Sequence, residues 1–303
     1  MKSHAVKMFL ATIILSLCSL AGEKLNIVTT IPDFADFSRN IGGDRVSVIS
    51  LMRGDQDPHA VEPRPSMVMQ VKKADLLIRV GMDLDVWVES LINASRNSKV
   101  MKEASGYLDA SQTITKLEIP EGKIDGSMGD IHCYGNPHYW TDPENAAPIL
   151  NRILSRLVEL RPADAEIFRR NYQGYSEKLA ATIQKWKAVL LPFKDAAIVT
   201  YHNSWPYFVR CFGLDIAGYV EPKPGIPPTP RHISMLIDKM RASNAKILVM
   251  EPYFNLKTAT AIAEKAGAKV VVLSPSVGGV RGANTYIDLL EYNVNHLADA
   301  LKK

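Results

Sequence analysis

The sequence predicts an α/β protein with two βα lobes, each a parallel sheet flanked by helices, joined by one long rigid helix. Two observations lead to this class. Short runs rich in Val, Ile and Leu alternate with helical segments of ten residues or so, once in each half of the chain, and such alternation favours parallel sheets covered by helices. Between the two alternating parts lies a helical stretch that is too long to serve one small lobe.

The first alternating part contains three expected strands with helices between them. The strands are 24–30 (KLNIVTT), 45–51 (RVSVISL) and 74–80 (ADLLIRV), and the helices are 32–41, 67–73 and 84–94. Residues 106–135 are rich in Gly, Ser and Asp, so we expect them to be irregular.

The middle of the chain carries apolar residues at helical spacing over 144–160 and again over 162–190, with Pro162 well placed to open the second helix. At 1.5 Å per residue the second helix would be roughly 43 Å long. We therefore expect it to join the two lobes. The expected organisation is a signal peptide (1–21), an N-terminal lobe (22–160), the connecting helix (161–191) and a C-terminal lobe (192–303).

The second alternating part repeats the pattern of the first. Its expected strands are 196–201, 214–220, 246–250 and 269–273, and its expected helices are 204–212, 230–242, 258–266 and 286–301.

The N-terminus is typical of a cleaved export signal. Two lysines precede an apolar run of fourteen residues, 8–21, and small residues near its end predict a cut after Ala21. Fourteen residues are too few to span a bilayer, which needs about 20. Cys18 could carry a lipid anchor, but the preceding Leu17 is larger than the residue that lipoprotein signals carry there. We expect a free periplasmic protein that does not span the membrane.

The net charge limits the classes of partner that the protein can bind. Loss of the two signal lysines lowers the net charge from +4 to +2, and no basic stripe interleaved with aromatic residues is present. This composition gives nucleic-acid binding no support. The mature chain keeps Cys133 and Cys211, whose pairing is left open. We expect a monomer.

Three histidines follow or adjoin the expected strands. His59 lies in the loop after strand 45–51, His138 lies before the helix that begins at 144, and His202 directly follows strand 196–201. Ligands collect beyond the carboxyl ends of parallel strands. Each histidine alone is more often a hydrogen-bonded structural residue, but their shared placement predicts three imidazoles in one cleft between the lobes.

Several imidazoles in one cleft suit Zn²⁺, which takes about four ligands. Glu251 directly follows strand 246–250 and is our candidate for the fourth, although a carboxylate there could equally form a salt bridge or cap a helix. Glu62 and Glu221 lie in neighbouring loops, where they could orient the ligands. His132 is a candidate secondary ligand.

Several segments together carry a family resemblance. They are "GDQDPHAVEPRPS" (54–66), "ADLLIRVGMDLDVWVESLI" (74–92), "NPHYWTDPENA" (136–146), "VTYHNSWPYFVRCFGL" (199–214), "EPKPGIPPTPRHISML" (221–236), "ILVMEPYF" (247–254) and "NTYIDLLEYN" (284–293). With them the chain resembles the zinc/manganese-binding solute-binding proteins of metal ABC importers, the TroA-like group. The resemblance implies that His59, His138 and His202 bind the metal and that a membrane permease is the partner. A histidine at 202, where manganese binders tend to carry glutamate, favours zinc.

The sequence departs from this family pattern in two places. Members usually supply an aspartate in the loop after the last strand, whereas this chain reads "LSPSVGG" with Pro275 where the aspartate would fall. The fourth ligand is therefore Glu251 or water. The long histidine-rich loop of many zinc binders is reduced here to "GSMGDIHCYG".

The leading hypothesis is a periplasmic, high-affinity receptor that delivers Zn²⁺ to an ABC permease, with no catalytic cofactor and no enzymatic activity. Mn²⁺, Fe²⁺ and Cu²⁺ are alternative ions. The rival is a secreted zinc-dependent hydrolase that uses the same histidines and a metal-bound water. Against it, the chain has no HExxH helix and no clear general base other than Glu251.

Overall fold

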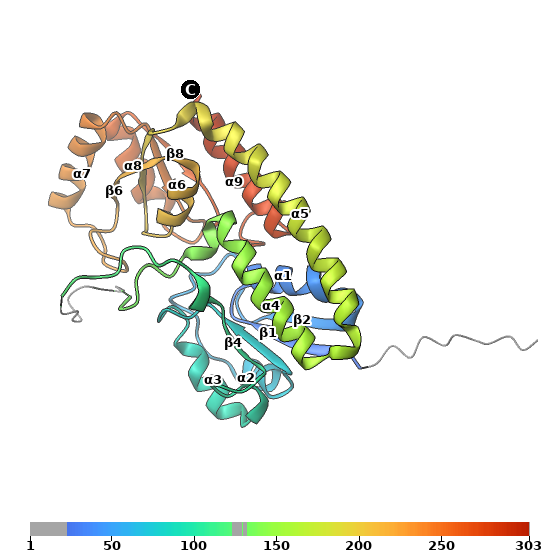
Figure 1. Cartoon of the computed structure of the whole chain (residues 1–303). Coiled ribbons are helices and arrows are strands. Elements are labelled where there is room, and N and C mark those ends of the chain that lie inside the picture. The colour runs from blue at the N-terminus through green and yellow to red at the C-terminus, as the bar shows by residue number, and fades with distance from the viewer. Residues whose placement is uncertain (1–22, 123–128, 130–131, 303) are drawn as a thin grey trace, which may run out of the picture.

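The computed structural model describes residues 23–122, 129 and 132–302. The predicted signal peptide and Cys18 lie outside this part of the chain. The described residues form two four-stranded parallel sheets, one in each half of the chain, and helices flank both (Figure 1). This arrangement confirms the predicted fold class.

The N-terminal sheet has the strand order β2-β1-β3-β4. Its strands are β1 (Leu25–Thr29), β2 (Val46–Ser50), β3 (Leu76–Arg79) and β4 (Tyr107–Asp109), and its helices are α1 (Pro32–Gly42), α2 (Pro65–Lys72) and α3 (Trp87–Ser95). β1 and β3 at the centre of the sheet are almost wholly buried, as strands covered on both faces must be.

β4 corrects one expectation, because it lies inside the stretch that we expected to be irregular. Its three residues pair with β3, with Tyr107 opposite Leu77 and Asp109 opposite Arg79. A strand of three residues at the edge of a sheet shows too little periodicity to be recognised among glycines and aspartates.

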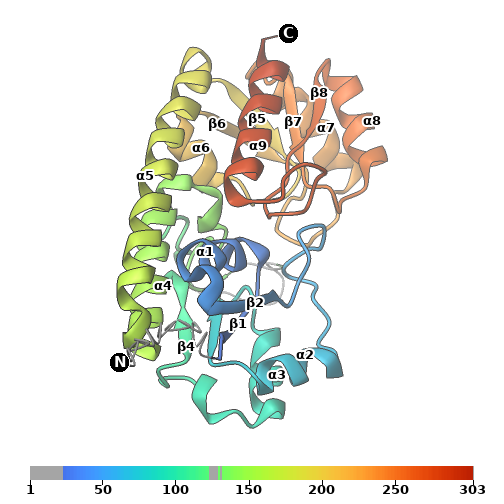
Figure 2. The same ribbon diagram turned by 90° about the vertical axis from the view of Figure 1, so that its right-hand side faces the viewer.

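Two helices follow the first sheet, α4 (Ala146–Leu160) and α5 (Ala165–Leu190). Pro162 opens a short 3-10 turn, Pro162–Asp164, so α5 begins three residues later than predicted. With 26 residues, α5 is about 39 Å long at 1.5 Å per residue. It packs on α1 and α4 of the first half and on α9 of the second, and it runs along both lobes (Figure 2).

The C-terminal sheet has the order β6-β5-β7-β8, the same topology as the first. Its strands are β5 (Ala197–Thr200), β6 (Asp215–Tyr219), β7 (Ile247–Met250) and β8 (Lys269–Val272), and its helices are α6 (Pro206–Phe212), α7 (Pro230–Ala242), α8 (Leu256–Ala266) and α9 (Tyr286–Leu301).

The two lobes share one hydrophobic core. A single cluster of buried side chains extends from β1 and α1 through α5 to α6 and α9, and a smaller cluster lies between the second sheet and helices α7 and α8. Polar bonds also cross the boundary: Trp140 Nε1 donates to the Pro275 carbonyl at 2.7 Å, and the Tyr286 hydroxyl donates to the Trp140 carbonyl at 2.6 Å. Close-packed interfaces of this kind resist large hinge motions.

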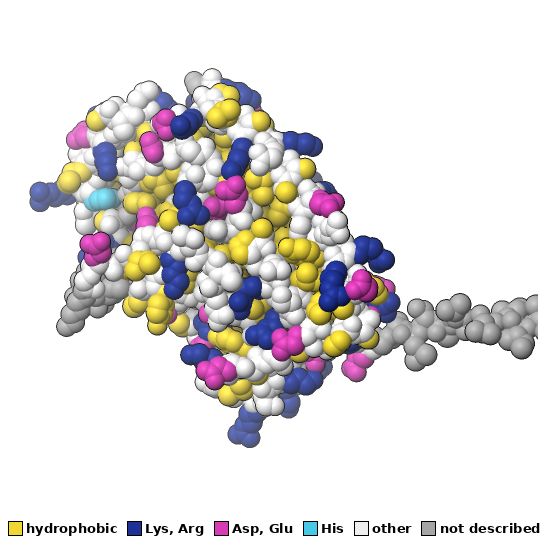
Figure 3. Space-filling view, viewed as in Figure 1, with side chains coloured by type: hydrophobic (Ala, Val, Ile, Leu, Met, Phe, Trp, Pro, Cys, Tyr) yellow, Lys and Arg dark blue, Asp and Glu magenta, His cyan; other side chains and the backbone are white. Residues whose placement is uncertain are grey.

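Basic, acidic and hydrophobic side chains are interspersed on the face shown in Figure 3. Among the described residues, no helix has both the length and the apolar character that crossing a membrane requires.

Candidate metal centre

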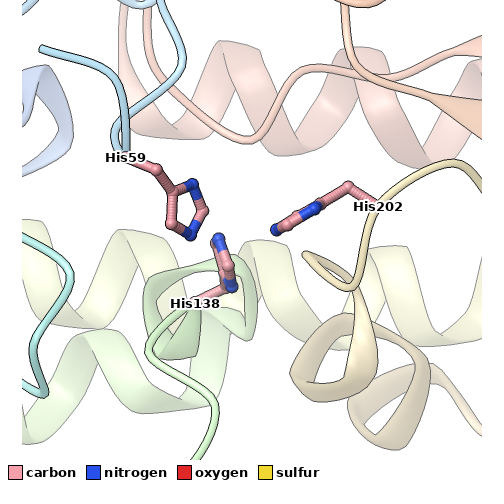
Figure 4. A group of neighbouring side chains, drawn as sticks. All are labelled: His59, His138 and His202. Carbon is pink, nitrogen blue, oxygen red and sulfur yellow. The ribbon is translucent and has the colours of Figure 1, made fainter. Parts of the chain in front are cut away.

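The three predicted histidines meet at the boundary between the lobes. His59 lies in the loop after β2, His138 in the loop before α4, and His202 two residues beyond the end of β5. Their ring centroids are 5.0 to 5.4 Å apart, and one ligand nitrogen of each lies within 4.8 Å of the other two. The rings point toward a common centre (Figure 4).

Each imidazole is held through its Nδ1 atom. The partners are Asp57 Oδ1 at 2.8 Å from His59, Asn136 Oδ1 at 3.1 Å from His138, and Glu221 Oε2 at 2.7 Å from His202. Since all three partners are oxygen acceptors, each neutral ring carries its proton on Nδ1 and keeps the Nε2 lone pair free. The Nε2 atoms of His59 and His138 are buried and have no hydrogen-bond partner. This is the arrangement that metal-binding histidines have.

Two of these histidines share a local backbone design. In Asp57-Pro58-His59 and in Asn136-Pro137-His138, the first side chain accepts from the histidine backbone N–H, at 2.9 and 3.0 Å, and also from the ring. Both segments are Asx turns. The proline between the acceptor residue and the histidine has a fixed φ, which limits the motion of the turn. Asp57 and Asn136 were not among the residues singled out from the sequence. The tripeptides "DPH" and "NPH" were the signal.

The third histidine is held by an acid from the neighbouring strand. Glu221 follows β6, and its backbone N–H donates to the Tyr201 carbonyl at 3.1 Å. Its Oε2 also accepts from the Gly225 N–H at 3.1 Å. The predicted orienting role of Glu221 is therefore present in the geometry. Glu62, the other residue suggested for this role, is exposed and holds none of the three rings.

Burial and charge repulsion from neighbouring rings favour the neutral form of the His138 imidazole. Burial, followed by the positive charge that His59 and His202 would carry, lowers the pKa of His138 well below its usual range. Around Asp57, burial acts to raise the carboxyl pKa, but hydrogen bonding and charge attraction from His59 outweigh it and lower the pKa. A neutral His138 ring and an ionised Asp57 carboxylate suit a bound cation better than a bound proton.

Two more ionisable residues lie close by. The His132 ring is 5.3 Å from that of His59, its Nε2 is buried without a partner, and burial, with the His59 charge, lowers its pKa to about 3. Glu251, fully buried after β7, accepts from Trp205 Nε1 at 3.0 Å, and burial raises its pKa to about 8. Glu251 lies outside the group of ligand atoms within 4.8 Å of one another, so its role as a ligand stays a prediction.

The remaining residues singled out from the sequence lie outside the cluster of ligand atoms. Pro275 contributes its carbonyl to Trp140, as described above. Cys133 and Cys211 are free thiols, the first exposed. Two further histidines lie in helices, His232 in α7 and His296 in α9.

A cavity of about 310 Å³ adjoins the rings of His138 and His202. His132, His138 and His202 line it, together with Glu118, Asn136 and Pro224.

The whole described chain matches one family. The family model for the zinc-uptake complex component A periplasmic protein, ZnuA, covers residues 27–300. The chain belongs to the ZnuA family. Membership of this family makes the chain a periplasmic metal-binding receptor of the kind that serves ABC importers.

Similar proteins of about the same length are named for different metals. The iron-binding protein YfeA of Yersinia pestis is 29% identical over 91% of this chain and 86% of its own length. The manganese-binding lipoprotein MntA of Halalkalibacterium halodurans is 28% identical over 93% and 90%. A crystal structure of ZnuA, 25% identical, superposes with a TM-score of 0.77 over 92% of this ZnuA-family chain and 99% of that chain.

Proposed function

We propose that this ZnuA-family protein binds Zn²⁺ through the Nε2 atoms of His59, His138 and His202 and delivers the ion to an ABC permease. One observation carries the proposal: three imidazoles from three loops converge while a separate acceptor occupies each Nδ1. Three Nε2 atoms that face one point suit a bound cation, and burying those of His59 and His138 without a partner is costly.

Zinc is the proposed ion because the three candidate ligand atoms are all imidazole nitrogens. Imidazole suits Zn²⁺, and also Fe²⁺ and Cu²⁺, whereas Mn²⁺ is better matched by carboxylate oxygens. Relatives named for manganese and iron make the ion a matter for experiment. Competition dialysis with equal Zn²⁺, Mn²⁺ and Fe²⁺ under anaerobic conditions should leave zinc bound, and retention of manganese would overturn the choice.

The fourth ligand has two protein candidates, His132 and Glu251, with water as the third. His132 has its Nε2 directed at no other group, and Glu251 has an unpartnered Oε2. Comparing zinc affinity in H132A and E251Q separates them: the variant whose affinity falls by about tenfold or more supplied a ligand, and water is the ligand if neither falls.

We propose that the lobes, 22–160 and 192–303, move little when the ion leaves. The shared core and the 26-residue α5 favour rearrangement of the site loops over hinge opening. We further propose a monomer that is free in the periplasm after cleavage behind Ala21. Intact-mass measurement of the exported protein tests this point, and a lipidated Cys18 would contradict it.

Equilibrium dialysis with ⁶⁵Zn, run beside an ester and peptide hydrolysis screen, tests the receptor function. The proposal expects one tightly bound zinc per chain, no turnover, and loss of binding in H59A, H138A and H202A. H296A, a surface histidine on α9, is the matched control and should bind normally. Turnover abolished by E251Q would favour the hydrolase instead.

A further inference from the structure

Glu118 connects loops that carry two of the candidate ligands. Its Oε2 accepts from Asn136 Nδ2 at 2.9 Å and from Asn203 Nδ2 at 2.8 Å. Asn136 holds the ring of His138, and Asn203 directly follows His202. One carboxylate oxygen from the N-terminal half therefore reaches a ligand loop in each lobe.

The amide of Asn136 has all its polar atoms engaged. Its Oδ1 accepts from the His138 ring and backbone, as described above, while its Nδ2 donates to Glu118 and to the Asn203 carbonyl at 2.8 Å. The two donations fix which way the amide faces. Without the Glu118 carboxylate, Asn136 Nδ2 keeps only one of its two acceptors. The Asn136 side chain is then less firmly held, and so is the His138 ring that donates to it.

The backbone around Glu118 is built to present its side chain. Glu118 has φ of +52°, a left-handed conformation that non-glycine residues adopt only when neighbouring contacts enforce it. The contacts come from both lobes: the Leu117 N–H donates to the buried Tyr207 hydroxyl at 2.9 Å, and that hydroxyl donates to the Asn136 carbonyl at 3.0 Å. The Asn136 N–H completes this cycle of hydrogen bonds by donating to the Leu117 carbonyl at 2.8 Å.

A second side chain of the C-terminal lobe contacts the same carboxylate. Tyr219, at the end of β6, hydrogen bonds to Glu118, and its burial, followed by the Glu118 charge, raises the pKa of the phenol. Because α6, β6 and the His202 loop all belong to one lobe, these contacts tie Glu118 to that lobe as a unit.

We propose that Glu118 is a positioning residue that sets the geometry of His138 and His202 together, and so controls how fast the ion leaves. This inference rests on the proposed function. Glu118 acts through Asn136 and Asn203 and touches no ion itself. Because the side chain is partly exposed, its loss weakens the site without dismantling it.

Stopped-flow release of zinc to a fluorescent chelator tests the proposal in E118A, E118Q and E121A. Hydrogen bonds to charged groups of this kind are worth enough to change a rate by about three- to tenfold when partly exposed. We expect E118A to release zinc faster by that factor. E118Q keeps an acceptor oxygen and should restore slow release, and E121A removes a carboxylate three residues along the same loop and should match the wild type.

Amide hydrogen exchange in the metal-free protein supplies the second measurement. Faster exchange at residues 202–207 in E118A, with an unchanged melting temperature, supports the interlobe connection even if E118A binds zinc poorly. Equal zinc release by E118A and wild type, or equal acceleration in E118Q and E118A, overturns the proposal. Failure of the wild type to bind zinc would instead overturn the proposed function.

Discussion

The Nδ1 atom of His202 lies 2.7 Å from Oε2 of Glu221, and both side chains are almost completely buried. The acid follows β6 and the histidine follows the neighbouring β5, so the pairing is a direct product of parallel strand order. A buried carboxylate behind an imidazole fixes the Nδ1–H tautomer and makes Nε2 a better donor to a cation.

Replacing Glu221 by glutamine should lower zinc affinity by about 10- to 100-fold. Glutamine retains the shape but loses the charge that favours a cation at the far nitrogen of His202. Isothermal titration with a competing chelator measures the change. The control is E62Q, which replaces an exposed glutamate in the loop after His59. An equal loss of zinc affinity in both variants would show that the overall negative charge, and not the Glu221–His202 pair, sets the affinity.

The contribution of Asp33, in α1, to stability should fall as the pH rises from about 4 to 8. Burial raises the pKa of this carboxyl from 3.8 to about 8, and its Oδ1 accepts from the Val277 N–H of the other lobe at 3.3 Å. The folded state therefore binds the proton more tightly than the unfolded state. This contribution to stability is complete below pH 3.8 and is lost as pH approaches 8.

The variant D33N isolates this effect, since an amide resembles the protonated acid. Urea unfolding at pH 5 and pH 8 should show a smaller loss of unfolding free energy in D33N than in wild type. D44N, at an exposed acid, should behave like the wild type. An identical pH dependence in D33N and wild type would contradict the assignment.

Two glycines should respond oppositely to alanine. A Cβ on Gly54 would meet the Val277 carbonyl oxygen at 2.0 Å and the Gly279 nitrogen at 2.5 Å, at the point where the His59 loop touches the other lobe. We expect G54A to destabilise the protein by about 1–3 kcal/mol.

Gly174 lies within α5, where a Cβ would meet nothing within 4 Å. Because alanine is the better helix former, G174A should stabilise the protein by about 0.5–1 kcal/mol. Thermal and urea unfolding measure both variants. Destabilisation by G174A would mean that α5 needs flexibility at this position.

Most of the fold could be predicted because the central strands β1, β3, β5 and β7 are buried and read as short apolar runs, separated by amphipathic helices. The start of α5 and the presence of strand β4 could not be predicted. Pro162 fits either a helix start or a 3-10 turn, and the three residues of β4 gain their pairing only from β3.

In the candidate site, too, some residues could be predicted from the sequence and others could not. His59 and His202 could be found because each lies in the loop after a strand, and the topology brings these loops to one edge. His138 lies in the loop before α4. Asp57 and Asn136 lie only two residues before a histidine, and their role depends on Asx turns that a pattern of apolar residues does not reveal. Glu118 could not be found at all from the sequence, since its partners Asn136 and Asn203 are 18 and 85 residues away.

A crystal of the zinc-loaded protein, with anomalous scattering recorded at the zinc edge, tests the central claim most directly. The account predicts one strong peak about 2.0–2.2 Å from the Nε2 atoms of His59, His138 and His202, with each Nδ1 still held by its acceptor. A zinc peak elsewhere, or any of the three rings turned away from the ion, would contradict it.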